Sequence, residues 1–293
     1  LIFTSLISSD YLLSFESTLF YFRFGFFSLA IWYLLNEYGL ALLKKFYFVF
    51  LFVYLFVIFD GYFQFIFGIN IFGNEYNNIR LSGLFGNELI LGSYLSRLFL
   101  LVFALSTFLY NNKYIILLNI FVLILSDILI YLSGERSAFV YLILATILII
   151  TLTSRWRKIR LISFMFTICI LFFLTIFNQN IKVRVFDYTL KQTNIISFFN
   201  HEDKKNKILS EDQIDKNLFI FSPQHEAHYI SAIKMFNANK LFGVGPKLFR
   251  KLCKDEKYYT YFRVEDRQYW GCQTHPHNTY IQLLAETGLI GFL

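Results

Sequence analysis

Long apolar runs alternate with short polar connections through most of the chain. About 20 apolar residues in a helix cross a bilayer core about 30 Å thick, and backbone groups in lipid must be satisfied within the segment, which favours helices. The pattern predicts transmembrane helices at residues 11–35, 46–67, 89–110, 114–132, 137–153 and 161–177, with a stub of a further helix at 1–7.

Basic residues lie in every second connection between these runs. They are Lys44, Lys45, Lys113, Arg155, Arg157, Lys158 and Arg160. Cytoplasmic loops are enriched in Lys and Arg, so the sequence predicts that these connections face the cytoplasm. The connections at 68–88 and 133–136 and the long stretch 178–276 would then face outward.

Composition supports a membrane protein. Hydrophobic residues make up 56% and charged residues 16%, with a mean hydropathy of +0.51, whereas a soluble domain has about 25% charged residues. This excludes a soluble globular enzyme, a disordered protein and a nucleic-acid binder. The net charge of +7 comes from basic residues placed between apolar runs.

The stretch 178–276 has a different composition and contains all three Pro. Ile230, Ile233 and Phe236 stand at helical spacing within 225–239. The sequence GVGP at 243–246 predicts a turn, with Pro246 as the first residue of a helix through Phe249 and Leu252. The charged segment 200–217 is expected to form a mobile surface.

These features predict an all-α fold. Residues 1–177 would form a polytopic integral membrane helical bundle, and 178–276 a large, mainly helical periplasmic loop domain. Residues 277–293 would begin the next transmembrane helix. Because the first residue is Leu and the last apolar run simply stops, we expect the chain to be a fragment of a longer protein.

Ionisable residues within predicted transmembrane helices are costly and therefore candidate functional groups. They are Glu16, Arg23, Asp60, Arg97 and Asp127. One interpretation is structural pairing between helices, and the other is a polar cavity that opens outward. Glu16 and Arg23 are seven residues apart and would share a helix face.

Two outward-facing arginines are candidate anion ligands. Arg80 begins RLSGLFGNE, and Arg136 lies in SGERSAF at a turn that enters a helix. Backbone N–H groups at a helix start together with a guanidinium form a site suited to phosphate. The alternative is contact with lipid headgroups, or pairing of Arg136 with Glu135.

His275 and His277 flank Pro276 where the outer segment returns to the membrane. A histidine has a pKa suited to general base catalysis, although a simple interfacial role is an alternative. Zinc binding by these residues with His225, His228 and Cys272 is a further alternative, but the sequence contains neither HExxH nor CxxC.

Cys253 and Cys272 both lie in the outer segment, whereas Cys169 lies within a predicted transmembrane helix. An oxidising compartment favours a disulfide between the outer pair. Two unpaired thiols remain the alternative.

At these residues the chain resembles the O-antigen ligase/polymerase superfamily. His277, Asn278, nine residues, Gly288 and Gly291 match the ligase pattern H-[NSQ]-x9-G-x-x-G. SGERSAF, RLSGLFGNELILGSYL at 80–95 and GVGP are similar to further family segments, so the resemblance covers about residues 60–293. The terminal helices expected of the family are missing.

The resemblance implies a bacterial inner-membrane glycosyltransferase that needs no cofactor and no metal. The donor would be a polyprenyl-diphosphate-linked glycan and the acceptor lipid A-core or another hydroxyl. His277 would be the base, Arg80 and Arg136 would bind the diphosphate, and His275 and Asn278 would contact substrate. Alternatives are a polysaccharide polymerase, a protein O-oligosaccharyltransferase, and a bicarbonate-type anion transporter.

Overall fold

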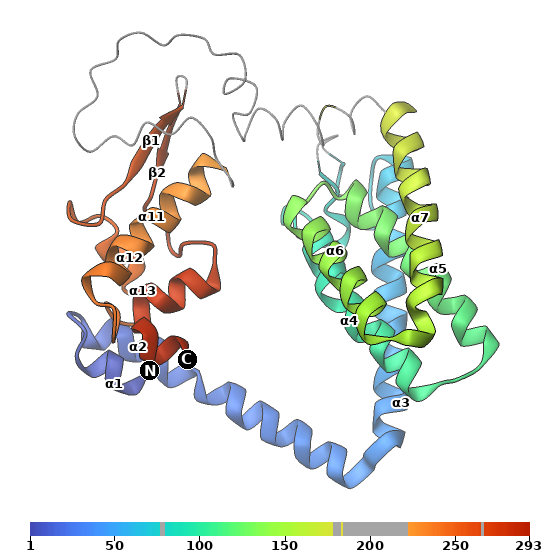
Figure 1. Cartoon of the computed structure of the whole chain (residues 1–293), viewed down its shortest axis with the longest axis horizontal. Coiled ribbons are helices and arrows are strands. Elements are labelled where there is room, and N and C mark those ends of the chain that lie inside the picture. The colour runs from blue at the N-terminus through green and yellow to red at the C-terminus, as the bar shows by residue number, and fades with distance from the viewer. Residues whose placement is uncertain (77–79, 178–182, 184–221, 265–266) are drawn as a thin grey trace. The chain divides into compact units, whose positions relative to one another are not determined.

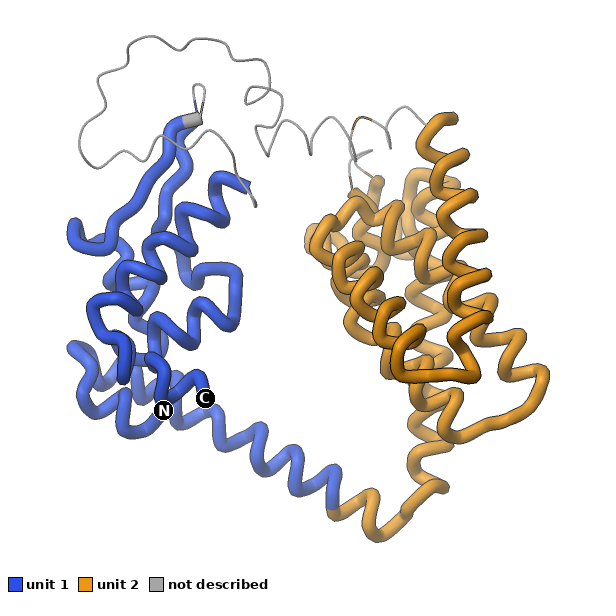
Figure 2. The backbone as a smooth tube through the Cα atoms, in the orientation of Figure 1, with its two compact units in different colours: residues 1–32, 188–293 blue, residues 33–187 orange. Residues whose placement is uncertain are grey.

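The computed structural model describes residues 1–76, 80–177, 183, 222–264 and 267–293. The chain forms two compact units, which Figure 2 shows in different colours. Unit 1 comprises residues 1–32 and 188–293, and unit 2 comprises residues 33–187. The predicted mobile segment 200–217 lies outside the described residues.

Unit 2 is a bundle of apolar helices. They are α3 (Phe22–Phe67, whose first part belongs to unit 1), α4 (Leu91–Leu109), α5 (Lys113–Leu132), α6 (Arg136–Leu152) and α7 (Ser154–Phe177). The helices run up and down, so the connections that follow α4 and α6 lie at the same end of the unit (Figure 1). Buried aromatic and aliphatic side chains, including Tyr54, Leu95 and Phe99, form the core between them.

The described helices are long and apolar enough to cross a membrane in four places. These are Tyr11–Phe67, Leu91–Leu109, Lys113–Leu132 and Ser154–Phe177. The first contains two of the predicted transmembrane helices, 11–35 and 46–67, and the predicted connection between them. A further apolar helix, α6, has 17 residues and is about 25 Å long. The prediction of an all-α, polytopic fold is confirmed.

The break within the long helix lies at Gly39, inside the predicted connection between 11–35 and 46–67. Gly39 adopts φ 53° and ψ −139°, which interrupts the helical backbone of α3. Glycine tolerates this left-handed conformation because it has no Cβ. Lys44 and Lys45 consequently lie in helix after the kink, and the prediction that they occupy a loop is wrong.

A buried ion pair joins two helices of unit 2. The Nη1 and Nη2 atoms of Arg160 donate to the two carboxylate oxygens of Asp127 at 2.8 and 3.0 Å, and neither side chain is exposed. Thr146 of α6 accepts a hydrogen bond from the same guanidinium. For Asp127, the structure therefore supports pairing between helices.

This pair also corrects the placement of Arg160. The sequence assigned Arg160 to a cytoplasmic loop, but α7 begins at Ser154 and carries Arg160 into the bundle. An unpaired charge in an apolar interior is costly. The long arginine stem reaches Asp127 instead of leaving the guanidinium near the helix end.

The N-terminal helices α1 (Ile2–Leu6) and α2 (Tyr11–Phe20) pack within unit 1. Glu16 pairs with Lys247 at 2.8 Å, and Ser14 Oγ donates to the carbonyl of Pro246 at 2.9 Å. The helix is interrupted at Tyr21. The expected uninterrupted helix over 11–35 is therefore wrong, and Glu16 has a partner far away in the sequence.

The rest of unit 1 contains three helices and one hairpin among the described residues. They are α11 (Pro223–Ala238), α12 (Phe249–Leu252), β1 (Tyr261–Val264), β2 (Arg267–Trp270) and α13 (Thr279–Phe292). The strands pair antiparallel, with Tyr261 opposite Trp270 and Arg263 opposite Gln268. Helices α11 and α13 pack against each other (Figure 1).

Two details of unit 1 differ from the sequence expectation. Helix α11 buries Ala227, Ala232 and Met235, whereas Ile233 is 45% exposed, so its buried face is built from smaller residues than predicted. Helix α12 begins at Phe249, not at Pro246. Lys247 has φ 65°, a left-handed conformation that cannot continue a right-handed helix.

The orientation of the bundle leads to a labelling prediction. In a Cys169→Ser background, single cysteines at Glu88 and Ile233, both exposed, should react with a membrane-impermeant maleimide in intact spheroplasts. A cysteine at Lys158 should react only after permeabilisation, because the basic connections are retained in the cytoplasm. Reaction at position 158 before permeabilisation would contradict the orientation.

Candidate functional site

His277 lies between buried Pro276 and the first turn of α13. Its backbone has φ 58°, in the left-handed region. Non-glycine residues in this region carry strain and occur often at functional sites. The His277 side chain is exposed, so an incoming hydroxyl group has access to the ring.

Asn278 fixes the backbone that follows. Its side-chain oxygen accepts hydrogen bonds from the backbone N–H groups of Tyr280 and Ile281 at 3.0 and 3.2 Å. This is an N-cap, which satisfies N–H groups that have no partner within the helix. The structure therefore gives Asn278 a local role at the start of α13, and its contact with substrate stays a prediction.

Four histidines gather around this position. The ring of His277 lies 4.3 Å from that of His275, 5.3 Å from that of His228 and 5.5 Å from that of His225, centroid to centroid. His225 and His228 come from α11, so the contact between α11 and α13 builds the cluster. The sequence shows that these two histidines are three residues apart, but it does not show that they lie close to His277.

Two histidines of the cluster have lowered pKa values. Burial, then the neighbouring His277, His225 and His275, lowers the pKa of His228 to about 4. Burial, then His275 and His225, also lowers the pKa of His277 below its ordinary value of 6.5. A neutral imidazole accepts a proton, so at neutral pH His277 is in the form that a general base requires.

Gln224 connects this cluster to the hairpin. Its Nε2 atom lies 2.9 Å from Nε2 of His228 and donates to the carbonyl of Trp270 at 3.1 Å. His228 Nε2 then acts as the acceptor, which fixes a neutral tautomer. Sequence analysis missed Gln224, because one glutamine beside two histidines in a helix carries no distinctive signal.

The glycines of the family-like segments meet in one junction. Helix α13 is kinked at Gly288, whose φ is 64°, and the backbone of 240–245 runs along it. Val244 N–H donates to the carbonyl of Ala285 at 2.9 Å. A Cβ on Gly288 would lie 2.4 Å from the backbone of Leu241, and one on Gly243 would lie 2.4 Å from the backbone of Glu286. These glycines thus allow close backbone approach.

A disulfide links Cys253 and Cys272, whose Cα atoms are 5.0 Å apart. It joins the end of α12 to the segment that leads to His275. Cys169 is unpaired among the described residues.

The disulfide predicts one free thiol in oxidised, denatured protein and three after reduction. Closing a loop of this length stabilises a fold by about 3 kcal/mol, so reduction should lower the melting temperature of unit 1. A titration with a thiol reagent gives the count. Three free thiols before reduction would remove the disulfide from the structure of the native protein.

Arg136 is the first residue of α6, and the preceding residue contacts another helix. Glu135 accepts hydrogen bonds from the N–H of Gly92 at 2.9 Å and from the hydroxyl of Ser93. These are N-terminal residues of α4, so Glu135 ties the turn before α6 to the start of α4. The first turn of α6 contains no acidic residue, and the acidic group at this helix end is its N-cap residue Glu135.

The turn that carries Arg80 is held by buried polar groups of α3 and the outer loop. Gln64 Oε1 accepts from the N–H groups of Ser82 and Gly83 at 3.0 and 2.8 Å, and the Asn70 amide donates to the carbonyl of Gly83 at 2.7 Å. Asp60 accepts from the N–H of Ile71 at 2.9 Å. The sequence singled out Asp60, but not Gln64 or Asn70.

Arg80 and Arg136 lie within electrostatic range of each other in unit 2. Two like charges beside a helix N-terminus repel, and an anion bound between them relieves that repulsion. The binding of a phosphate or diphosphate by these two residues stays a prediction. His277 belongs to unit 1, so the structure describes the two parts of the predicted site separately.

The other intramembrane candidates divide into two groups. Glu16, Asp60 and Asp127 each have a protein partner. Arg23 and Arg97 are exposed, and Arg23 lies over the ring of Phe24. Among the described residues, no group of three His, Cys, Asp or Glu side chains is arranged to hold a metal ion.

Comparison with known proteins places this chain in a family. The family model described as O-antigen ligase matches residues 120–293, which include Arg136, the histidine cluster and the glycine junction but not Arg80. No curated protein and no solved structure matches the chain. The match covers more than half of the chain and agrees with the helical membrane fold, so the chain belongs to the O-antigen ligase family.

Proposed function

We propose that this membrane protein transfers a glycan from a polyprenyl-diphosphate carrier to an acceptor hydroxyl on the periplasmic side of the inner membrane. The proposal rests on the position and surroundings of His277. It is exposed, held in a left-handed backbone conformation and surrounded by three other histidines, within the region that matches the family.

His277 would act as the general base. Its neutral imidazole takes the proton of the acceptor hydroxyl, and the oxygen forms a bond to the anomeric carbon of the donor glycan. The bond between that carbon and the diphosphate oxygen breaks at the same time, and its electron pair stays with the leaving diphosphate. Such a direct displacement inverts the anomeric configuration.

Arg80 and Arg136 would bind the donor diphosphate. Arginine stays charged at all relevant pH values and binds two oxygens through its planar fork. The charge on the leaving group increases as the glycosidic bond breaks, and the two guanidiniums stabilise that charge.

The family leaves the acceptor open between lipid A-core, a growing polysaccharide and a protein. We propose lipid A-core, because His277, Asn278, Gly288 and Gly291 match the ligase pattern in full. Purified protein is tested with one polyprenyl-diphosphate glycan and each of the three acceptors in turn. Transfer only to a second glycan would identify a polymerase, and transfer only to protein an oligosaccharyltransferase.

The same assay tests whether a metal takes part. Because the arginines provide the positive charge, transfer should be unchanged in EDTA. Loss of transfer in EDTA and its recovery on addition of Zn²⁺ would contradict the metal-free mechanism. His225, His228, His275 and His277 would then be the first candidates for ligands.

Anion transport, the alternative from another functional class, is less well supported. A transporter requires intramembrane charged groups that line a path. Asp127 and Glu16 instead form ion pairs with Arg160 and Lys247. Asp60 binds the backbone of the loop that carries Arg80.

A further inference from the structure

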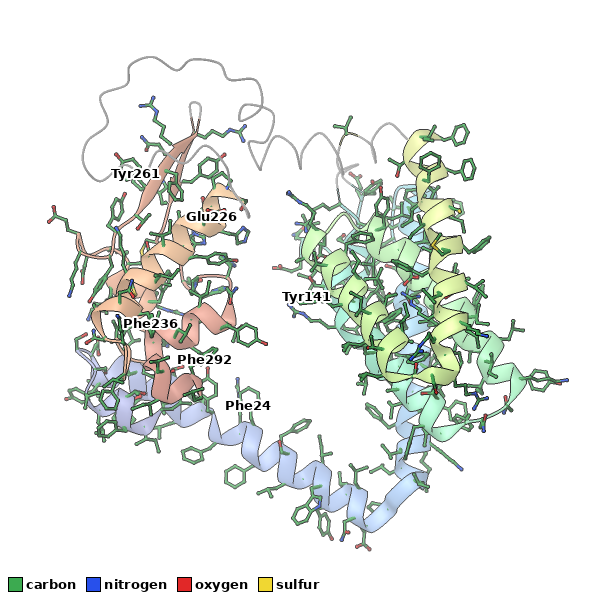
Figure 3. All side chains as sticks on the ribbon, in the orientation of Figure 1. Phe24, Tyr141, Glu226, Phe236, Tyr261 and Phe292 are labelled. Carbon is green, nitrogen blue, oxygen red and sulfur yellow. A yellow bond between two sulfur atoms is a disulfide. The ribbon has the colours of Figure 1, made fainter. Side chains whose placement is uncertain are left out.

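The hairpin of β1 and β2 has one face against α11 and one face away from it. Successive side chains of a strand point to opposite faces. Phe262 and Tyr269, which pair across the strands, pack with Ala227 and Ile230 of α11. Tyr261 therefore shares the opposite face with Trp270, its own cross-strand partner; Figure 3 labels Tyr261 on this hairpin.

Three aromatic rings form a cluster on this second face, which we call the aromatic platform: Tyr259, Tyr261 and Trp270. The rings of Tyr261 and Trp270 are 5.8 Å apart and inclined by 29°. Tyr259 lies 6.1 Å from Tyr261 and 5.8 Å from Trp270. Trp270 is 45% exposed. Exposed tryptophan at a polar surface is typical of binding sites.

Polar side chains complete the face. Arg263 and Gln268 are cross-strand partners, two residues along from Tyr261 and Trp270, and so lie on the same face of the hairpin. Both are exposed. The described side chains of this face thus combine aromatic rings with hydrogen-bonding groups and include no aliphatic residue. A pyranose ring has the matching chemistry, with C–H groups on its faces and hydroxyl groups around its edge.

We propose that the aromatic platform binds the sugar rings of the glycan that is transferred. This proposal rests on the glycosyl-transfer function proposed above. The positively polarised C–H groups of a sugar pack on the negative face of an aromatic ring. The Gln268 amide and the Arg263 guanidinium are donors for the equatorial hydroxyl groups.

Contacts within unit 1 connect the platform to the histidine cluster. The Trp270 carbonyl accepts a hydrogen bond from Gln224 Nε2, and the same Gln224 atom contacts His228. The ring of His228 in turn lies 5.3 Å from that of His277. The backbone of the strand that carries the Trp270 ring is therefore tied to the histidine cluster.

A membrane surface is the main alternative partner, because Trp and Tyr also gather at bilayer interfaces. Peripheral insertion into lipid normally adds aliphatic or Phe side chains to the aromatic residues. The described side chains of this face are instead Gln268 and Arg263 beside the three rings. This composition favours a carbohydrate.

The test uses the full chain in nanodiscs of phosphatidylethanolamine and phosphatidylglycerol. The probe is the oligosaccharide repeat unit released by mild acid from the surface polysaccharide of the cell that makes this protein. Saturation-transfer NMR measures its dissociation constant. The variants are Trp270→Ala, Trp270→Phe, which keeps an aromatic ring, and His277→Ala. Trp32→Ala is the matched control, since Trp32 is 70% exposed and lies in α3.

Trp270→Ala should weaken oligosaccharide binding about five- to tenfold, and Trp270→Phe only about twofold. Trp32→Ala and His277→Ala should bind as the wild type does. Unchanged binding in Trp270→Ala, or no saturation transfer from the wild type, would overturn the platform. Quenching of Trp270 emission by brominated lipid, measured as the difference between the wild type and Trp270→Phe, would identify a membrane anchor and overturn it too.

These outcomes separate the platform from the proposed function. If Trp270→Ala binds normally while His277→Ala abolishes transfer, the platform is wrong and glycosyl transfer stands. If Trp270→Ala loses binding while His277→Ala transfers glycan normally, the platform stands and the assignment of the base is wrong.

Discussion

Replacement of His277 by alanine should reduce glycan transfer by about 10²- to 10⁴-fold, the usual contribution of a general base. The donor should still bind, because the base contacts the acceptor hydroxyl and not the diphosphate. The measurement is single-turnover transfer by the full-length protein, with donor binding followed separately. Transfer by His277→Ala at the wild-type rate would show that another group removes the proton.

The backbone at this position requires a second variant. His277 has φ 58°, and alanine is strained there, so a loss of transfer in His277→Ala alone does not distinguish loss of the base from a changed loop. Asparagine tolerates the left-handed region but is not a base. His277→Asn should therefore keep the wild-type melting temperature and still lose transfer. His275→Ala, which removes an exposed neighbour, should have a much milder effect.

The pH dependence of transfer provides an independent readout of the same group. Because the base works in its neutral form, transfer should be constant at high pH and fall as the pH drops through the pKa of His277. Burial and the neighbouring histidines lower that pKa below 6.5. His275→Gln removes one repulsive neighbour, so the pKa should rise and the acidic fall in rate should move to higher pH. A fall in rate at an unchanged pH would show that His275 does not influence the base.

Apolar run length predicted the helices well, because burial in lipid constrains composition over many consecutive residues. It predicted their ends less well. The kink at Gly39 lies within the predicted connection 36–45, but the chain stays helical through the polar residues around it, and the break at Tyr21 lies within a predicted helix. Arg160 was misplaced because counting charges along the chain ignores the reach of a long side chain toward Asp127.

The residues of the site were visible in the sequence, but their surroundings were not. Histidines beside a proline, and arginines two or three residues from a glycine, are local signals. The packing of His225 and His228 on His277 depends on the contact between α11 and α13, which are separated by about 40 residues of sequence. The hairpin was not predicted either. In two strands of four residues each, the alternation of apolar and polar side chains is too short to be recognised.

Replacement of either Arg80 or Arg136 by alanine should reduce kcat/KM by about 10²- to 10³-fold, the usual cost of losing one group that stabilises developing charge. Unlike His277→Ala, these variants should also weaken donor binding, because a diphosphate carries its charge before the reaction begins. Arg→Lys should restore only part of the activity, since an ammonium group keeps the charge but lacks the two-pronged hydrogen bonding of the guanidinium.

Arg155→Ala is the matched control for these variants. Arg155 is exposed and is the second residue of α7, so the variant removes the same charge from a helix end that is predicted to face the cytoplasm. Donor binding and transfer should be unchanged in it. The double variant should lose less donor affinity than the sum of the losses in Arg80→Ala and Arg136→Ala. The two guanidiniums repel each other, so removing one stabilises the other in the absence of donor. Wild-type donor affinity in both Arg80→Ala and Arg136→Ala would show that the diphosphate binds elsewhere, even if transfer were lost.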